Sequence, residues 1–159
     1  MKQLKSLMFS AAASVLMLAG STVLAHTDDV LAAQKAPNGG QQRMAGAYHF
    51  ELVVAGDSKE ARDNPVVVYV TDHAGAKVPT VGAGGTATIL AGKQKASVKL
   101  VPDGENRLKG VGRYAATADM KVVVSITLSG KAAEQARFTP LAPMASSAAA
   151  KDGHTDHKH

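Results

Sequence analysis

The sequence predicts an all-β fold, an antiparallel β-sandwich of about seven short strands. Between residues 47 and 141, apolar and polar residues alternate with the period of two that is typical of strands. The alternating segments end at Gly, Pro, Asn or Asp, the residues that favour turns. No convincing amphipathic helix interrupts them. Short strands at this spacing, without helices between them, are typical of a sandwich.

Six segments carry the alternation, and the first shows it most fully. In residues 47–55, Tyr48 and Phe50 fall on one face, while His49 and Glu51 fall on the other. This pattern predicts a strand with one buried face and one surface face. The other segments, each of which predicts one strand, are 65–72, 86–90, 96–101, 120–128 and 133–141.

Two of the connections have residues that suit a tight turn. In "DHAGAK", residues 72–77, we expect Asp72 to cap the turn and His73 to be an exposed loop residue. In "PDGEN", residues 102–106, Pro presets φ and Gly accepts a positive φ. Both segments therefore predict turns of the chain, the first of them in a hairpin.

Residues 1–25 predict a cleaved secretory signal. Two lysines precede an uncharged apolar run, and Val23 and Ala25 stand at the small-residue positions that a signal peptidase needs. We expect cleavage before His26. No later segment is apolar over a spanning length, so the mature protein is expected to be soluble and not membrane-embedded. The expected compartment is the periplasm of a diderm bacterium.

The mature chain divides into three parts by composition. A Pro-Asn-Gly-Gly cluster interrupts the first part, which reads as a lead-in arm with one short helical turn at "DDVLAAQ". The last part is small and polar with nothing to bury, and it is expected to be a flexible, histidine-rich tail. The expected divisions are the arm 26–46, the sandwich 47–142 and the tail 143–159.

Composition excludes several classes of function. The net charge of +5 is modest, the cations are scattered and aromatic residues are 4% of the chain, so no nucleic-acid partner is expected. The absence of cysteine excludes disulfides, thiolate metal sites and cysteine nucleophiles. Neither "G-x-S-x-G" nor "H-E-x-x-H" occurs, and we expect no enzymatic activity.

The segments "MAGAYHFELVV", "VVVYVTDHAGAKVP" and "VGRYAATADMKVVVSI" together resemble the YtkA-like family of small exported domains. The resemblance covers roughly residues 40–140 and implies an immunoglobulin-like sandwich, often associated with metal transport, without catalytic activity. A looser similarity links the chain to periplasmic copper-resistance proteins of the CopC type. They are also cysteine-free sandwiches whose mature chain begins with a histidine, here His26.

His26 is the sharpest candidate for metal chemistry. A mature N-terminal histidine offers its α-amine and its imidazole Nδ1 to the same ion, a chelate that no internal histidine forms. Nitrogen donors suit Cu²⁺, and Asp28 or Asp29 is expected to add an oxygen. The alternative is that signal cleavage leaves a histidine first by chance.

The C-terminal "HTDHKH" holds three of the six histidines of the chain. His154, His157 and His159 on a flexible segment can wrap one ion, and short histidine-rich tracts are a metal-binding composition. The alternative is a solvated tail that keeps the protein soluble. The concentration of histidine in the last six residues favours metal binding.

The internal histidines and the methionines are weaker candidates. His49 is more often a structural or solvated residue than a ligand, whereas His73 completes a site with His26 if its hairpin lies beside the arm. Met44, Met120 and Met144 are not clustered as in Cu⁺ sites, so we expect core or spacer roles.

These observations predict a periplasmic protein that binds transition-metal ions. Cu²⁺ is the expected ion, and Zn²⁺ or Ni²⁺ are competitors. The protein would buffer metal or deliver it to an efflux or resistance system in the membrane. The alternative is an immunoglobulin-like interaction module that docks on an exported protein or a membrane transporter, with the histidines incidental.

Overall fold

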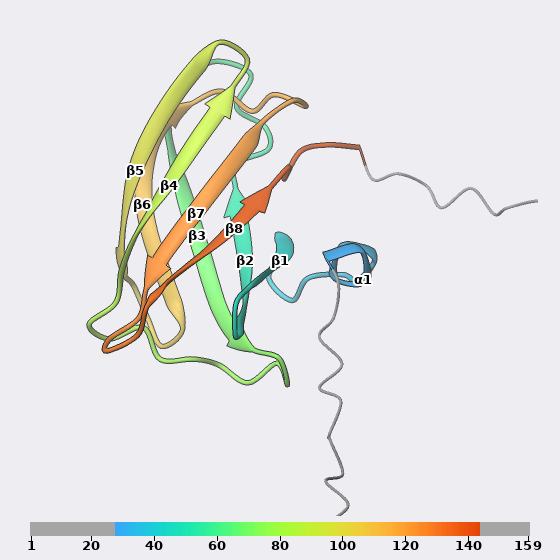
Figure 1. Ribbon diagram of the computed structural model, residues 1–159. Coiled ribbons are helices and arrows are strands. Elements are labelled where there is room, and N and C mark those ends of the chain that lie inside the picture. The colour runs from blue at the N-terminus through green and yellow to red at the C-terminus, as the bar shows by residue number, and fades with distance from the viewer. Residues whose placement is uncertain (1–27, 144–159) are drawn as a thin grey trace, which may run out of the picture.

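The computed structural model describes residues 28–143, which form eight antiparallel strands preceded by one short helix (Figure 1). The predicted all-β antiparallel fold is confirmed. Along the described residues, no helix is both long and apolar enough to cross a membrane. The elements are α1 (Asp28–Ala33), β1 (Gln41–Ala45), β2 (Tyr48–Val54), β3 (Arg62–Asp72), β4 (Gly84–Ala91), β5 (Gln94–Pro102), β6 (Arg107–Tyr114), β7 (Lys121–Thr127) and β8 (Ala133–Phe138).

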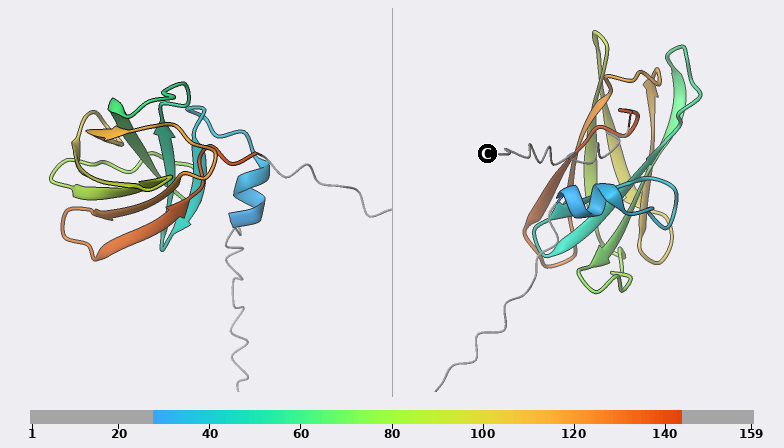
Figure 2. Two further views of the ribbon diagram at one scale, coloured as in Figure 1. Left: turned by 90° about the horizontal axis from the view of Figure 1, so that it is seen from above. Right: turned by 90° about the vertical axis from the view of Figure 1, so that its right-hand side faces the viewer.

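The strands form one sheet in the order β1-β2-β3-β6-β5-β4-β7-β8. The sheet curls so that β4, β7 and β8 face β2, β3 and β6 across the core (Figures 1 and 2). Its two edge strands, β1 and β8, come close to each other, and the backbone N–H of Thr139 donates to Oε1 of Gln41 at 2.7 Å. The eight strands therefore form one nearly closed antiparallel sheet.

The core lies between the two halves of the sheet and confirms the predicted alternation in several strands. Alternate residues of β3 and β7 are buried, and burial of each such aliphatic side chain contributes about 1.5–3 kcal/mol. Residues from both halves are fully buried: Phe50, Leu52, Val66, Val68, Val70, Ile89, Leu100, Leu108, Met120, Val124, Ile126 and Phe138.

β1 lies inside the segment 26–46 that was expected to be an arm, so the sheet starts at Gln41. β6 also lies outside the six alternating segments, so the sheet has two strands beyond those six. A two-residue turn joins β1 to β2, with Gly46 at a φ of 58°. Glycine at the first position of such a turn is typical of type II′ hairpins, whose twist matches that of the strands. Gly46 is therefore the local feature that pairs β1 with β2.

The helical turn predicted near residues 28–34 is present as α1. This helix lies outside the sheet, beside β1 and β2, as Figure 2 shows. Leu31 of α1 is 3% exposed, and Ala36 after the helix is 6% exposed. Residues 28–40 thus pack on the outer face of the sheet, opposite the core.

Candidate functional site

The expectation that β2 has a surface face is wrong. His49 and Glu51 point away from the core, yet they are only 5% and 3% exposed. The reason is the packing of residues 28–40, because Leu31 and Pro37 line a hollow together with His49. The outer face of β2 is a second buried layer, which we call the outer-face site: Gln42, Met44, His49, Glu51, Thr71 and His73.

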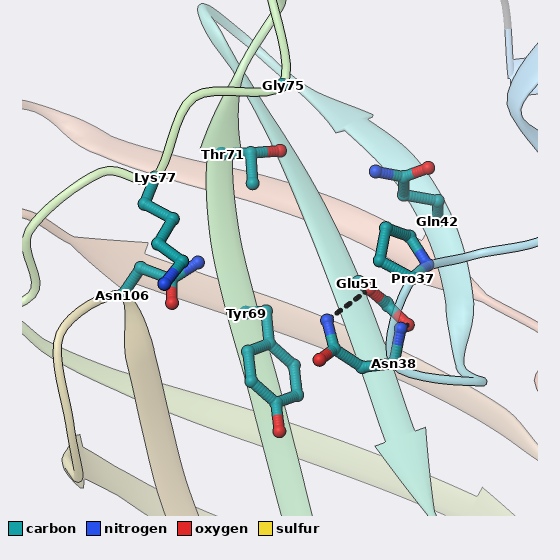
Figure 3. Close-up of a pocket in the computed structure, with 9 residues that line it drawn as sticks. All are labelled: Pro37, Asn38, Gln42, Glu51, Tyr69, Thr71, Gly75, Lys77 and Asn106. Carbon is teal, nitrogen blue, oxygen red and sulfur yellow. Dashed lines mark hydrogen bonds between the residues drawn. The ribbon is translucent and has the colours of Figure 1, made fainter.

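Glu51 holds the arm on this face. Its carboxylate oxygens accept hydrogen bonds from the backbone N–H of Asn38 at 2.8 Å, from Asn38 Nδ2 at 2.8 Å and from the backbone N–H of Gly40 at 2.9 Å. Figure 3 shows Asn38 and Glu51 facing each other beside Pro37. A side chain at Gly40 would collide with the backbone of Leu52, so glycine allows this close approach. Hydrogen bonds to a charged group contribute about 1.5–3 kcal/mol each.

A second attachment joins the start of α1 to β1. Oδ1 of Asp28 accepts a hydrogen bond from the backbone N–H of Met44 at 2.9 Å. Asp28 was expected to be an oxygen donor to a metal, and here one of its oxygens satisfies an outward-facing amide of the edge strand. His49 is the partner of Met44 in β2, so the beginning of the arm is held at the strand position that is paired with His49.

The hairpin after β3 brings the second internal histidine to the same place. Oδ1 of Asp72 accepts from the backbone N–H groups of Ala74 and Ala76, at 2.9 and 2.8 Å, which confirms the predicted capping role. This turn places the His73 ring on the His49 ring, with centroids 5.0 Å apart and an interplanar angle of 27°. His73 was expected to be an exposed loop residue, and the structure shows it only partly exposed.

Two hollows lie on the outer face of the sheet, each of about 270 Å³. One is bordered by His49, His73 and Gln42 together with arm residues. The other, drawn in Figure 3, is bordered by Glu51, Tyr69, Lys77 and Asn106 among others. The carboxylate of Glu51 already accepts hydrogen bonds from the arm. The hollow with the two imidazoles therefore offers more side-chain groups that could bind a metal ion.

Buried polar atoms lie beside both hollows, since His73 borders the histidine hollow and Thr71 borders the other. Among residues 28–143, His73 Nε2 and Thr71 Oγ1 are buried and have no hydrogen-bond partner. Thr71 lies opposite His49 in the pairing of β2 with β3. A buried polar group left unsatisfied costs about 1–3 kcal/mol, and such groups call for a water, an ion or a functional role. The outer-face site thus contains groups suited to binding.

The predicted metal residues divide between described and undescribed parts of the chain. Asp28 and His73 are described, whereas His26, His154, His157 and His159 lie outside residues 28–143. Within the described part, no three His, Cys, Asp or Glu side chains form a group that could hold a metal ion. The internal site therefore offers two imidazoles and needs further donors of another kind.

His49 was undervalued by sequence reasoning. The alternation in β2 places it opposite the core, and a residue there is exposed unless something else covers it. The available signal was in the arm, where Leu31 and Ala36 are apolar residues that a solvated segment would not need.

Comparisons with models of protein families, with curated proteins and with solved structures found no match to this chain.

Proposed function

We propose that the protein binds a transition-metal ion in the periplasm, with Cu²⁺ as the expected ion and Zn²⁺ or Ni²⁺ as competitors. Its role would be to buffer the ion or to deliver it to an efflux or resistance system. The observation that carries the proposal is the stacking of His49 on His73. Of the six histidines in the chain, these two lie within residues 28–143, and the other four are in the terminal segments.

The separation of the two rings suits a shared ion. With metal–nitrogen bonds of about 2.0–2.1 Å and bond angles of about 90–110°, two imidazoles on one ion have centroids about 4.5–5.2 Å apart. The centroids of His49 and His73 are 5.0 Å apart. The rings are stacked with an interplanar angle of 27°, so in this proposal they turn out of the stack when both bind one ion.

The terminal histidines supply further donors in this proposal. If cleavage exposes His26, its α-amine and Nδ1 chelate Cu²⁺ after losing their protons. Asp28, two residues later, is bonded to Met44 beside His49. The tail histidines add a second, weaker set of ligands.

Calorimetric titration with Cu²⁺ and Zn²⁺ tests this function on three proteins: the mature chain that starts at His26, the same chain with one extra N-terminal residue, and the chain without residues 151–159. The extra residue removes the α-amine chelate, so Cu²⁺ affinity is expected to fall at least about tenfold. Deletion of the tail is expected to lower the number of bound ions. Replacement of Lys151 and Lys158 by Gln is the matched control, since it keeps every histidine.

Binding no tighter than that of isolated surface histidines in all three proteins would show that the metal proposal is wrong. In that case the alternative is an interaction module that docks on an exported or transporter partner. A docking role predicts that the terminal variants keep their function, because the docking surface would lie on the sandwich.

A further inference from the structure

We infer that Met44 completes the stacked histidine pair as a third ligand, and that His49, His73 and Met44 together form a site for Cu⁺. This inference deepens the proposed function and rests on it, because it assumes that the outer-face site binds a metal. It assigns Cu⁺ to this internal site, whereas Cu²⁺ is the ion expected at the terminal chelate of His26, and it adds a thioether ligand. The site needs no residue from the terminal segments.

The strand register puts Met44 next to His49. The two residues are direct partners in the antiparallel pairing of β1 with β2, so their side chains emerge on the same face. The backbone N–H of Met44 points away from β2, since it donates to Asp28. Met44 and His49 therefore form a non-hydrogen-bonded pair, the type in which facing side chains come closest.

The three residues come from three different segments and lie on the same side of the sheet, where Met44 is paired with His49 and His73 stacks on His49. Met44 is on β1, His49 is on β2, and His73 is in the hairpin that the Asp72 carboxylate holds in place. Met44 is partly buried and His49 is 5% exposed, so the arm limits the access of water. His73 Nε2 is buried with no hydrogen-bond partner among residues 28–143, which leaves a nitrogen donor available there.

The donor set favours a soft ion. Thioethers select Cu⁺, and imidazoles bind it as well, whereas hard ions require carboxylate oxygens. The carboxylates beside these residues are already engaged: Glu51 accepts three hydrogen bonds from the arm, and one oxygen each of Asp28 and Asp72 accepts from backbone N–H groups. Two imidazoles and a thioether in a shielded site are thus a better match for Cu⁺ than for Zn²⁺ or Ni²⁺.

The absence of cysteine makes this inference easy to test. Any sulfur bound to copper must come from a methionine, and in the mature chain these are Met44, Met120 and Met144. Met120 is fully buried in the core on the opposite side of the sheet, so Met120→Leu is a matched control. Met44→Leu keeps the size and apolar character of the side chain but removes the ligand.

The experiment uses the full mature chain under anaerobic, reducing conditions. Cu⁺ affinity is measured by competition with a chromogenic Cu⁺ chelator, and X-ray absorption identifies the scattering atoms. We expect Met44→Leu to lower Cu⁺ affinity at least about tenfold and to remove the sulfur scatterer, while Zn²⁺ affinity changes less than about twofold. His73→Gln should weaken both ions, and Met120→Leu should change neither.

The inference is overturned if the copper-loaded wild-type protein has no sulfur scatterer, or if Met44→Leu binds Cu⁺ as tightly as Met120→Leu does. If copper still binds in either case, the proposed function survives and only the thioether ligand is lost. If the wild-type chain binds neither Cu⁺, Cu²⁺ nor Zn²⁺, both proposals fail. Circular dichroism of each variant checks that a loss of affinity does not come from unfolding.

Discussion

Tyr114 joins parts of the chain that are far apart in sequence. Its hydroxyl donates to the backbone oxygen of Pro65 at 2.7 Å and accepts from the backbone N–H of Ala55 at 3.1 Å. The ring itself is 1% exposed. Because burial removes the hydroxyl from water, it raises the pKa of Tyr114, and the Ala55 hydrogen bond opposes this in part.

Tyr114→Phe is expected to lower the free energy of unfolding by about 1–3 kcal/mol, because Ala55 and Pro65 keep their places but lose their partner. Urea denaturation measures the change. Tyr48→Phe is the control, since the Tyr48 hydroxyl makes no hydrogen bond within residues 28–143. Equal stability of the two variants would contradict this role of the hydroxyl.

The pH dependence of the same variant follows from the direction of the pKa shift. A folded-state pKa above the reference value of 10.0 means that the Tyr114 contribution is fully present below about pH 10. It is lost as pH rises from there through the folded pKa. The stability advantage of wild type over Tyr114→Phe should therefore shrink between about pH 9 and about pH 11. An advantage that grows with pH would show that the sign is wrong.

The role of a residue could be predicted from the sequence only where its partners are neighbours in the chain. Asp72 caps its turn because the donors lie two and four residues further along the chain. His49 shares the outer face with His73, 24 positions later, and both are covered by residues from before β1. Those contacts depend on tertiary packing, so no local pattern around His49 could have predicted them.

The same contrast holds for whole elements. β3 and β7 were predictable because alternate residues face the core, and their registers follow from that burial. β1 was missed because its residues "QQRMA" do not alternate between apolar and polar. As an edge strand covered by the arm, β1 has only one fully buried residue, Ala45. Its pairing depends on the turn more than on its own side chains.

The turn at Gly46 gives an element-scale prediction. Alanine there must adopt a φ near 58°, and its Cβ would approach the carboxylate of Glu134 on β8. Left-handed backbone costs a non-glycine residue about 1–2 kcal/mol, so Gly46→Ala should lower the free energy of unfolding by about that amount. Thermal or urea denaturation measures it.

Gly84→Ala is the matched control for that turn. Gly84 has no positive φ, and no atom lies within 4 Å of its added Cβ. Its replacement should change stability by less than about 0.5 kcal/mol. If Gly46→Ala is as harmless as this control, the turn does not determine the pairing of β1 with β2.

At the scale of the whole molecule, both faces of β2 are covered. The core packs on its inner face, and the arm packs on its outer face. A sandwich with a free lead-in segment was predicted, but residues 28–40 fold back and bury the outer face of β2. The packing of this segment on β2 depends on one buried carboxylate, that of Glu51, and on the hydrogen bond of Asp28 at the edge of the sheet. The arm thereby connects the start of the described chain to the two stacked histidines.

The last prediction concerns this cover. Glu51→Gln replaces one acceptor oxygen with an N–H₂ group that faces the donors of Asn38 and Gly40, so the arm should separate from the sheet. Tryptic cleavage after the exposed Lys35 is expected to accelerate several-fold, and unfolding should become easier by about 1.5–3 kcal/mol. Glu105→Gln, which removes an exposed ion pair with Lys77, should change stability by at most about 1 kcal/mol and leave cleavage unchanged. Equal cleavage rates for the two variants would mean that the arm is held by apolar packing of Leu31 and Ala36, and that Glu51 is not its main attachment.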